Sequence, residues 1–330
     1  MVQRRPLRRL RTRGGDAVRV AIVDLGTNTC RLFLAGVTSA SGVRADERLT
    51  TIVRLGQGVD GAGRLDPAAV ARTRACLADY ALRLEAYAPA RRLLVATSVL
   101  RDAADGRNFL VDVERDFALP SRVLAGEEEG ALAFRGGTAG LAGRARGPLL
   151  LTDIGGGSTE FALGVAGEKP GFVRSLDIGV VRLTERFVRH DPPRSEELDA
   201  LSAFVARAIA EGVPATVRGA AQGAVGVAGT YTTLVARKLA LTEYRSALVH
   251  GHVLSLADID AAIAELSGLT NEQRGRLPGI QKGREDVILA GALIAREACR
   301  AFGLGEVSCS EADILEGVAL ALADGSLHPG

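Results

Sequence analysis

Two segments of the chain repeat one arrangement of an aspartate, a tight turn and a second apolar run. The first begins Asp24-Leu25-Gly26-Thr27-Asn28-Thr29, and the second begins Asp153-Ile154-Gly155-Gly156-Gly157-Ser158-Thr159-Glu160. Turns rich in glycine, serine and threonine let consecutive backbone N–H groups point into one concavity, which suits phosphate oxygens. An acidic side chain beside such a turn can hold a hard cation that bridges to those oxygens. Two copies facing each other would therefore clamp phosphate groups between two domains.

Three carboxylates follow a short apolar segment at Gly126-Glu127-Glu128-Glu129. They could simply be helix N-terminal residues favoured by the helix dipole. A carboxylate that reaches the clamp could instead orient and deprotonate a water molecule that attacks phosphorus. Crowded like charges would also raise the pKa of one of them. The residues alone leave all three glutamates as candidates for a general base.

A loop of small residues, Val225-Gly226-Val227-Ala228-Gly229-Thr230, opens a predicted helix. Helix N-termini bind anions, so Gly226, Gly229 and Thr230 form a candidate nucleotide loop. An ordinary strand-to-helix connection has the same composition, and the sequence does not separate the two readings.

Cations supply the remaining candidate contacts. Arg31 follows the first turn, and Arg101 follows a turn-like Thr97-Ser98, so Arg31, Ser98 and Arg101 are candidate phosphate ligands. Further candidates from the same reasoning are Arg54, Lys282 and Arg284.

Strands and helices must position these groups, and their pattern predicts a duplicated α/β architecture. Apolar runs predict strands at about 18–23, 32–37, 48–55, 93–96 and 123–125, then at about 149–153, 159–165, 171–178 and 224–228. Asp66-Pro67 is typical of a helix start and predicts a long helix ending near Pro89. The chain after residue 239 reads as mostly helical. We expect one domain over 16–125 and a second over 126–330, with a helix at about 311–326 able to pack back on the first.

Composition limits the other function classes. Apolar residues make up 47% of the 330, but no run is long enough to span a membrane. Arginines crowd residues 1–15, which we expect to be a disordered basic tail. Outside it the charge is nearly balanced, so we expect no nucleic-acid binding beyond contacts of that tail. The cysteines show no C-x-x-C pair, which is typical of free thiols in a reducing cytoplasm.

Together these motifs resemble the exopolyphosphatase/guanosine pentaphosphate phosphohydrolase (Ppx/GppA) family of the actin, heat-shock chaperone and sugar-kinase superfamily. The resemblance runs from about Val18 to the C-terminus and implies two RNase-H-like (actin-like ATPase) domains with the active site in the cleft between them. The segments that carry it are Asp24 to Thr29 with Arg31, Ala96 to Arg101, Gly126 to Glu129, Asp153 to Glu160, Gly226 to Thr230, Gly283 to Asp286 and Ser310 to Gly317.

The resemblance implies Mg²⁺-dependent release of orthophosphate from a chain end, in the short two-domain form and as a homodimer. Matching motifs place Glu129 at the catalytic glutamate. They place Asp153 and Glu160 at acidic positions for metal and water, and Asp24 at the first phosphate motif, as a further metal ligand.

The chain departs from the family pattern at two places. An arginine is expected where Ala131 stands, and a second where Leu315 stands. These losses bear on polyanion affinity and substrate choice, whereas the acidic core of the chemistry is intact.

Four functions stay open at this point. The first is an exopolyphosphatase, and the second is a guanosine pentaphosphate 5′-phosphohydrolase that uses the same cleft. The third is an ATP-dependent kinase of the same superfamily. The fourth is a non-catalytic sensor of polyphosphate or alarmone.

Overall fold

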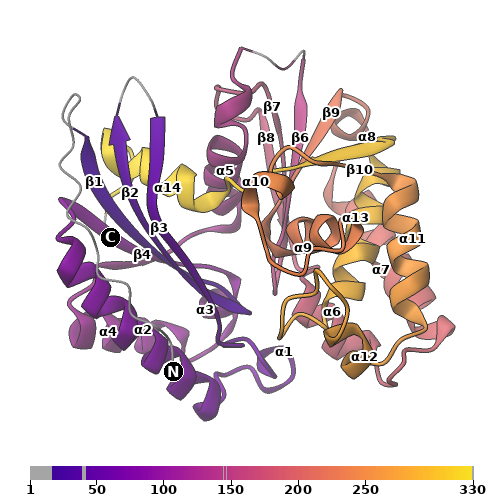
Figure 1. The fold of residues 1–330 in the computed structure, drawn as a ribbon, viewed down its shortest axis with the longest axis horizontal. Helices are drawn as coiled ribbons and strands as arrows, with labels where there is room; N and C mark the ends of the chain where they lie inside the picture. The colour runs from indigo at the N-terminus through magenta and orange to yellow at the C-terminus, as the bar shows by residue number, and fades with distance from the viewer. Residues whose placement is uncertain (1–16, 39–41, 144, 146, 329–330) are drawn as a thin grey trace.

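The chain folds into two α/β lobes, each built on one mixed sheet (Figure 1). The computed structural model describes residues 17–38, 42–143, 145 and 147–328, so the predicted basic tail lies outside the described residues. The sheet of the first lobe has the order β3-β2-β1-β4-β5. Its strands are β1 (Val18–Leu25), β2 (Thr29–Thr38), β3 (Gly42–Ile52), β4 (Arg91–Ala96) and β5 (Ser121–Val123).

The sheet of the second lobe has the order β10-β11-β9-β6-β7-β8. In both lobes an antiparallel meander of three strands is followed by a parallel strand beside the first one, which is the predicted duplication. The strands of the second sheet are β6 (Leu149–Ile154), β7 (Thr159–Gly164), β8 (Phe172–Leu176), β9 (Gly223–Val227), β10 (Val253–Ser255) and β11 (Glu306–Cys309).

Helices cover the outer face of each sheet. In the first lobe these are α1 (Val59–Ala62), α2 (Pro67–Tyr87), α3 (Ser98–Asp102) and α4 (Gly106–Phe117). The helices that follow β8 in the second lobe are α6 (Val180–Phe187), α7 (Ser195–Gly212), α8 (Ala215–Arg218), α9 (Ala228–Lys238), α10 (Ser246–Val249), α11 (Leu256–Ser267), α12 (Asn271–Gly275) and α13 (Ile288–Ala301). None of the described helices is long and apolar enough to cross a membrane.

Most predicted elements are confirmed, and the local reasons are visible. The Asp66 side chain accepts a hydrogen bond from the Ala69 amide (2.9 Å) and caps α2, which starts at Pro67 as expected. The segment after residue 239 is mostly helical as expected, but the two short strands within it, β10 and β11, were not predicted. These strands have three and four residues, too few to show an alternating pattern.

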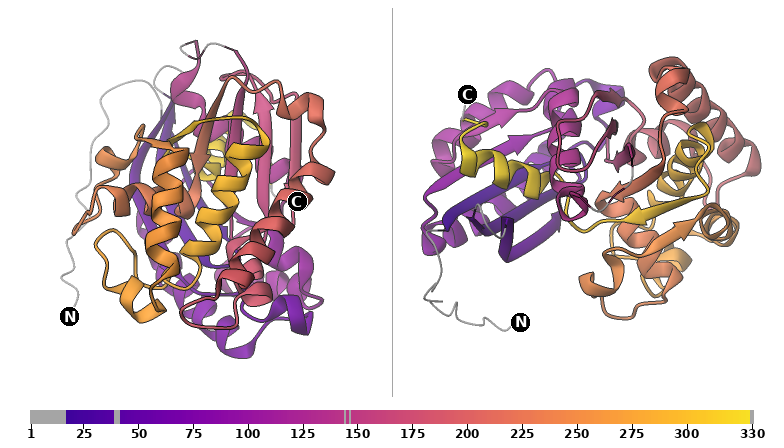
Figure 2. Two further views of the ribbon diagram at one scale, coloured as in Figure 1. Left: turned by 90° about the vertical axis from the view of Figure 1, so that its right-hand side faces the viewer. Right: turned by 90° about the horizontal axis from the view of Figure 1, so that it is seen from above.

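Two helices exchange places between the lobes. α5 (Gly126–Gly137) follows the first sheet in sequence but packs on β6, β7 and β8, whereas α14 (Ile314–Asp324) follows the second sheet but packs on β1 and β2. A short 3-10 turn, Ala139–Leu141, follows α5. Figure 2 shows α14, in yellow, alongside the indigo and purple strands. The two helices also pack on each other and share one core with both sheets.

Glycines allow α5 and α14 to approach closely. A Cβ atom on Gly136 would lie 1.9 Å from the carbonyl oxygen of Asp313, and one on Gly317 would lie 1.9 Å from that of Leu132. Neither position tolerates a side chain without moving backbone. The crossing therefore fixes how the two lobes meet, and the remaining candidate residues line the space between them.

Candidate active site

The two predicted turns face each other across a cavity of about 90 Å³ between the lobes. Each is closed by the same hydrogen bond, from the Gly26 amide to the Thr29 carbonyl (2.9 Å) and from the Gly155 amide to the Ser158 carbonyl (3.0 Å). The turns touch, because a Cβ atom on Gly156 would lie 2.8 Å from Cβ of Thr27. The cavity therefore has room for about one phosphate group in this conformation.

Carbonyl groups of both turns are held on the side away from the cavity. In the first turn the Thr27 carbonyl accepts from the Gly56 amide (2.8 Å), and the Asn28 carbonyl accepts from the amides of Val53 and Arg54 (both 3.0 Å). Since N–H and C=O of one trans peptide point in opposite directions, the amides that follow these carbonyls are directed toward the cavity.

The second turn is held in the same way by the start of α6. The carbonyls of Gly155 and Gly156 accept from the amides of Val180 and Val181 (both 2.9 Å), and the Gly157 carbonyl accepts from the Gly179 amide (3.2 Å). Gly179 has no room for a side chain, because a Cβ atom there would lie 2.3 Å from the Gly156 carbonyl oxygen. Both turns therefore direct backbone amides toward the cavity, the arrangement that the sequence predicted.

The side chain opposite each aspartate differs between the two units. In the β1–β2 register Asp24 faces Arg31, whereas in the β6–β7 register Asp153 faces Glu160. Arg31 donates to Asp24 (Nε to Oδ2, 2.7 Å) and also pairs with Asp313. The first unit thus holds a compensated ion pair, and the second holds two neighbouring acids.

Glu129 lies at the N-terminal end of α5 and is buried with 8% of its surface exposed. Arg101 of α3 donates to its Oε2 atom (2.9 Å) and to the Leu124 carbonyl (2.7 Å). Burial raises the pKa of Glu129 to about 7, against the lowering effect of Arg101. A carboxyl group with a pKa near 7 is suited to general base catalysis at neutral pH.

Asp153 and Glu160 are both buried acids with perturbed titration. Burial is the main cause that raises the pKa of Asp153 to about 8, with a further contribution from Asp313. Burial and the charge of Glu129 raise the pKa of Glu160, whose Oε1 atom accepts from Ser175 Oγ (2.7 Å). Such a cluster favours a bound cation or a bound proton, and buried clusters of this kind are concentrated at functional sites.

Several predicted site residues support the cavity instead of lining it. Thr159 is buried and donates to the Ile178 carbonyl (2.7 Å). Gly226 makes room for the ring of Tyr231, since a Cβ atom there would lie 2.5 Å from that ring. Glu160 lies opposite Asp153 in the strand register, and Arg101 pairs with Glu129. Neither Glu160 nor Arg101 lines the cavity. The predicted residues that do line the cavity are Asp24, Gly26, Thr27, Asn28, Thr29, Arg31, Ser98, Glu129, Asp153, Gly155, Gly156, Ser158, Gly229, Thr230 and Arg284.

Known proteins share this sequence and this architecture. Residues 42–325 match the model of the Ppx/GppA phosphatase family. The chain belongs to the Ppx/GppA phosphatase family. It is 40% identical to exopolyphosphatase 2 of Mycobacterium tuberculosis over 92% of this chain and 98% of that protein.

Solved structures agree with this assignment. An exopolyphosphatase-like protein of 31% identity superposes with a TM-score of 0.86, covering 94% of this chain and all of that one. The Aquifex aeolicus member of the Ppx/GppA family is 29% identical, with a TM-score of 0.78, covering 95% of this chain and all of that one. The resemblance noted from the motifs and the two-domain actin-like fold are confirmed.

One departure from the Ppx/GppA pattern has a structural context. Leu315, where an arginine was expected, is fully buried in the core that α14 shares with α5. Ala131 lies on α5 and is partly exposed. Neither position contributes a cation to the cavity.

Mg²⁺ was expected at Asp24, Asp153 and Glu160, and the donor atoms fit in part. Asp24 Oδ1 is buried without a hydrogen-bond partner, so it has a free lone pair to offer. Glu160 is already hydrogen-bonded to Ser175 and suits a supporting role. Within the described residues no three acidic, histidine or cysteine side chains converge on one point. A cation here would therefore need substrate oxygens as well, as Mg²⁺ commonly does.

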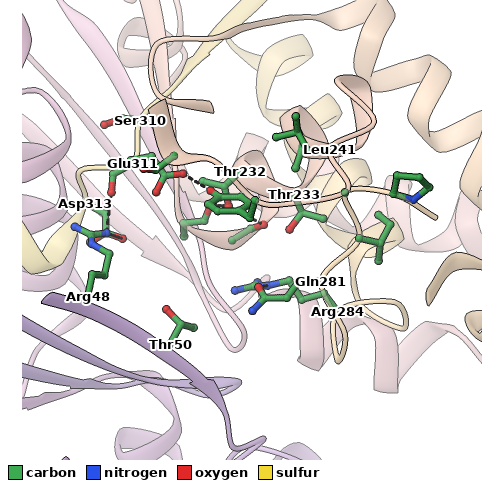
Figure 3. Close-up of a pocket in the computed structure, with 18 of the residues that line it drawn as sticks. Arg48, Thr50, Thr232, Thr233, Leu241, Gln281, Arg284, Ser310, Glu311 and Asp313 are labelled. Carbon is green, nitrogen blue, oxygen red and sulfur yellow. Dashed lines mark hydrogen bonds and ion pairs between the residues drawn. The ribbon is translucent and has the colours of Figure 1, made fainter. Parts of the chain in front are cut away.

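A larger pocket of about 640 Å³ adjoins the cavity and was missed by sequence reasoning (Figure 3). It shares Arg31, Gly229 and Arg284 with the small cavity, and its far wall is apolar, with Leu241, Leu277 and Ile280 among the lining residues. The predicted segments 226–230, 283–286 and 310–317 each contribute lining residues, but the sequence did not show that they meet β2, β3 and distant loops around one pocket.

Arg284 differs from the other predicted cations. Its Nε atom donates to Gln281 Oε1 (3.1 Å), and its guanidinium fills the space beside Gly229, where a Cβ atom would lie 1.8 Å from it. Burial and the charge of Arg31 lower its pKa to about 10. By contrast, Arg54 pairs with Asp286 (2.9 Å). Lys282 is exposed.

Proposed function

We propose that this Ppx/GppA phosphatase is an exopolyphosphatase that releases orthophosphate from the end of inorganic polyphosphate. The observation that carries the proposal is Glu129, a buried carboxylate with a pKa near 7 beside two opposed turns of backbone amides. The name of the 40% identical mycobacterial relative, exopolyphosphatase 2, supports the same substrate.

In the proposed reaction the terminal phosphate lies in the small cavity, against the amides that follow the Thr27 and Gly156 carbonyls. Glu129 takes a proton from a water molecule as its oxygen bonds to the terminal phosphorus. The bridging P–O bond breaks, and the shortened chain leaves with the electron pair. The fixed amides hold the phosphoryl oxygens before and during the reaction, and Arg31 stabilises the negative charge that develops on them.

Mg²⁺ use, a homodimer and a cytoplasmic location are further parts of the proposal. Asp24 and Asp153 would hold the cation, which would supply charge neutralisation at the phosphates. The fit of Asp24 Oδ1 supports this set. Titration of Mg²⁺ against phosphate release tests the first part, and light scattering of the purified protein tests the second.

A second substrate, guanosine pentaphosphate, is favoured by the larger pocket. Its apolar wall and the hydroxyl groups of Thr232 and Thr242 suit a nucleoside better than they suit further phosphates. The same cavity and the same base would then remove the 5′-terminal phosphate.

The test is orthophosphate release from long-chain polyphosphate and from guanosine pentaphosphate, with the wild type and Glu129→Gln. We expect the substitution to lower the rate by ~10²–10⁴-fold, the usual contribution of a general base. Glu127→Gln is the matched control, because Glu127 lies on the same helical turn with 58% of its side chain exposed.

Each outcome has one meaning. Release from polyphosphate that fails in Glu129→Gln supports the proposal, and release only from the nucleotide moves it to the second substrate. Tight binding of both without release would identify a sensor. A Glu129→Gln variant with nearly full turnover would remove Glu129 from the role of base.

A further inference from the structure

Arg182 is a partly buried arginine of α6 that the proposed reaction does not use. Its side chain is 16% exposed and contacts both lobes at once. The Nε atom donates to the Gly157 carbonyl (2.9 Å), within the second turn. The two terminal nitrogens pair with Asp60 of α1 and Asp102 of α3, both in the first lobe.

The bond to Gly157 acts on a group that faces the cavity. The Gly157 carbonyl and the Ser158 amide belong to one peptide and point in opposite directions. Ser158 lines the small cavity, so holding this carbonyl fixes the direction of an amide aimed at the phosphate site. The Gly179 amide is the second donor to the same carbonyl (3.2 Å). Arg182 is the side-chain donor at this point.

The ion pairs with Asp60 and Asp102 link Arg182 to α1 and α3, the two helices next to the first turn and to Glu129. α3 carries Asp102 together with Ser98, which is hydrogen-bonded to Thr27 Oγ1 (3.0 Å), and Arg101, which pairs with Glu129. α1 follows the loop that holds the first-turn carbonyls. One guanidinium therefore connects the second turn to the two elements that position the first.

Neighbouring contacts reinforce this connection. Glu185, one turn further along α6, accepts from the Gly58 amide at the start of α1 (3.1 Å). A Cβ atom on Gly157 would lie 2.6 Å from Ser98 Oγ of α3 and 2.9 Å from Thr27 Oγ1 of the first turn, so the two turns are in close contact here. An exposed ion pair contributes little, but a forked arginine with three bonds at a tight contact sets geometry as well as energy.

We propose that Arg182 is a positioning residue of the phosphatase reaction, which aligns the second phosphate turn with the first through Gly157, Asp60 and Asp102. This inference rests on the proposed function of the same cavity. Arg182 touches no substrate in this scheme. Its loss misaligns amides that bind phosphate in the ground state and the transition state alike, so the effect falls on KM more than on kcat.

The experiment compares Arg182→Met, Arg182→Lys and Asp60→Asn/Asp102→Asn with the wild type. Arg186→Met is the matched control on the same helix, because Arg186 is exposed and stacks over Phe204 (4.5 Å) away from the cavity. Steady-state phosphate release from polyphosphate, tripolyphosphate binding by calorimetry at saturating Mg²⁺ and thermal unfolding are measured for each.

We expect Arg182→Met to raise KM by about tenfold or more and to weaken tripolyphosphate binding equally, with kcat within about threefold of the wild type. Lysine keeps the charge but not the fork, so Arg182→Lys should recover part of the loss. The double asparagine variant should shift KM in the same direction by a smaller factor.

A merely structural role predicts something else. Vmax and the unfolding temperature would fall with the folded fraction while KM stayed at the wild-type value, and that result overturns the proposal. So does a KM within twofold of wild type in both Arg182→Met and the double variant. If the wild type released no phosphate from polyphosphate, the proposed function would fail, whereas the effect of Arg182→Met on tripolyphosphate binding would still decide this inference.

Discussion

The two strand–turn–strand units share a backbone but differ in chemistry. Both close their turn with the same hydrogen bond and expose amides to one cavity. Across the strand pair, however, Asp24 meets an arginine and Asp153 meets a glutamate. One residue therefore separates the chemistry of the two units. In the first, burial raises the pKa of Asp24 but Arg31 opposes the shift, whereas in the second Asp153 and Glu160 both have raised pKa values and no cation of the described residues pairs with either.

The supports of the two turns differ as well. The first turn is held by backbone amides of the loop after β3, all within its own lobe. The second is held by the start of α6 and by the Arg182 side chain, which reaches into the other lobe. The same turn geometry therefore occurs twice, and a difference in side chains makes the second turn depend on contacts with the first lobe.

Asp153→Asn should have the largest effect on activity. It tests the comparison by removing one of the two acids of the second unit. We expect activity to fall by ~10²–10³-fold, since a proposed ligand of the cation at the phosphate site is lost. Stability should rise by ~1–2 kcal/mol, because a buried acid beside other acids is removed. Phosphate release and urea unfolding measure the two effects.

The gain in stability should depend on pH. A folded-state pKa of about 8, above the value of 3.8 for an unperturbed aspartate, means that the folded protein keeps a proton that the unfolded chain releases. Wild-type stability therefore falls as pH rises between about 4 and 8, and Asp153→Asn should gain more at pH 8 than at pH 5. An equal gain at both pH values would contradict the raised pKa.

Asp24→Asn should have the opposite effect on stability. Arg31 would keep Asp313 but lose its second carboxylate while its side chain stays 15% exposed. We expect a loss of stability below the ~3–5 kcal/mol of a fully broken buried pair, because Asp313 still compensates Arg31. Chemical unfolding of the two asparagine variants side by side gives the test. A stabilised Asp24→Asn would show that the ion pair with Arg31 does not distinguish Asp24 from Asp153.

The pH dependence of catalysis should follow Glu129. With a pKa near 7, the rate constant kcat/KM should rise about tenfold per pH unit below pH 7 and level off above it, because the unprotonated carboxylate is the base. Glu127→Gln should keep this profile. A flat profile from pH 5 to pH 8 would assign proton transfer to another group.

Arg54→Met should give the smallest effect and sharpens the contrast with Arg182. Arg54 also bridges the lobes through Asp286 but is 36% exposed and holds neither turn carbonyl with its side chain. We expect KM and kcat to change by less than about threefold, and stability by less than ~1 kcal/mol. A KM increase matching that of Arg182→Met would show that any interlobe bridge has the same effect.

The sequence predicted what depends on local pattern. The turns, the capped start of α2 and the repeated strand order follow from spacing and turn chemistry. The general base could be narrowed to Glu129 only through the family resemblance, because the three glutamates are equivalent in sequence. Burial and Arg101 now distinguish it from Glu127, which is largely exposed.

Features that depend on distant segments were not predictable. Asp313 compensates Arg31 from the far end of the chain, and Arg182 meets Asp60 only in the folded molecule. The larger pocket is assembled from β2, β3, α9 and loops that lie far apart in the sequence. Strands β10 and β11 are too short for their pattern to be recognised.

The exchange of α5 and α14 has a consequence for synthesis on the ribosome. The first sheet buries its inner face partly against Ile314, Val318 and Leu322, which are made last. Until the C-terminal segment emerges, β1 and β2 expose apolar surface that α14 covers in the folded protein. The first lobe is therefore translated first but can complete its core only after α14 is synthesised. Until then one face of its sheet is exposed, which favours aggregation of the nascent chain.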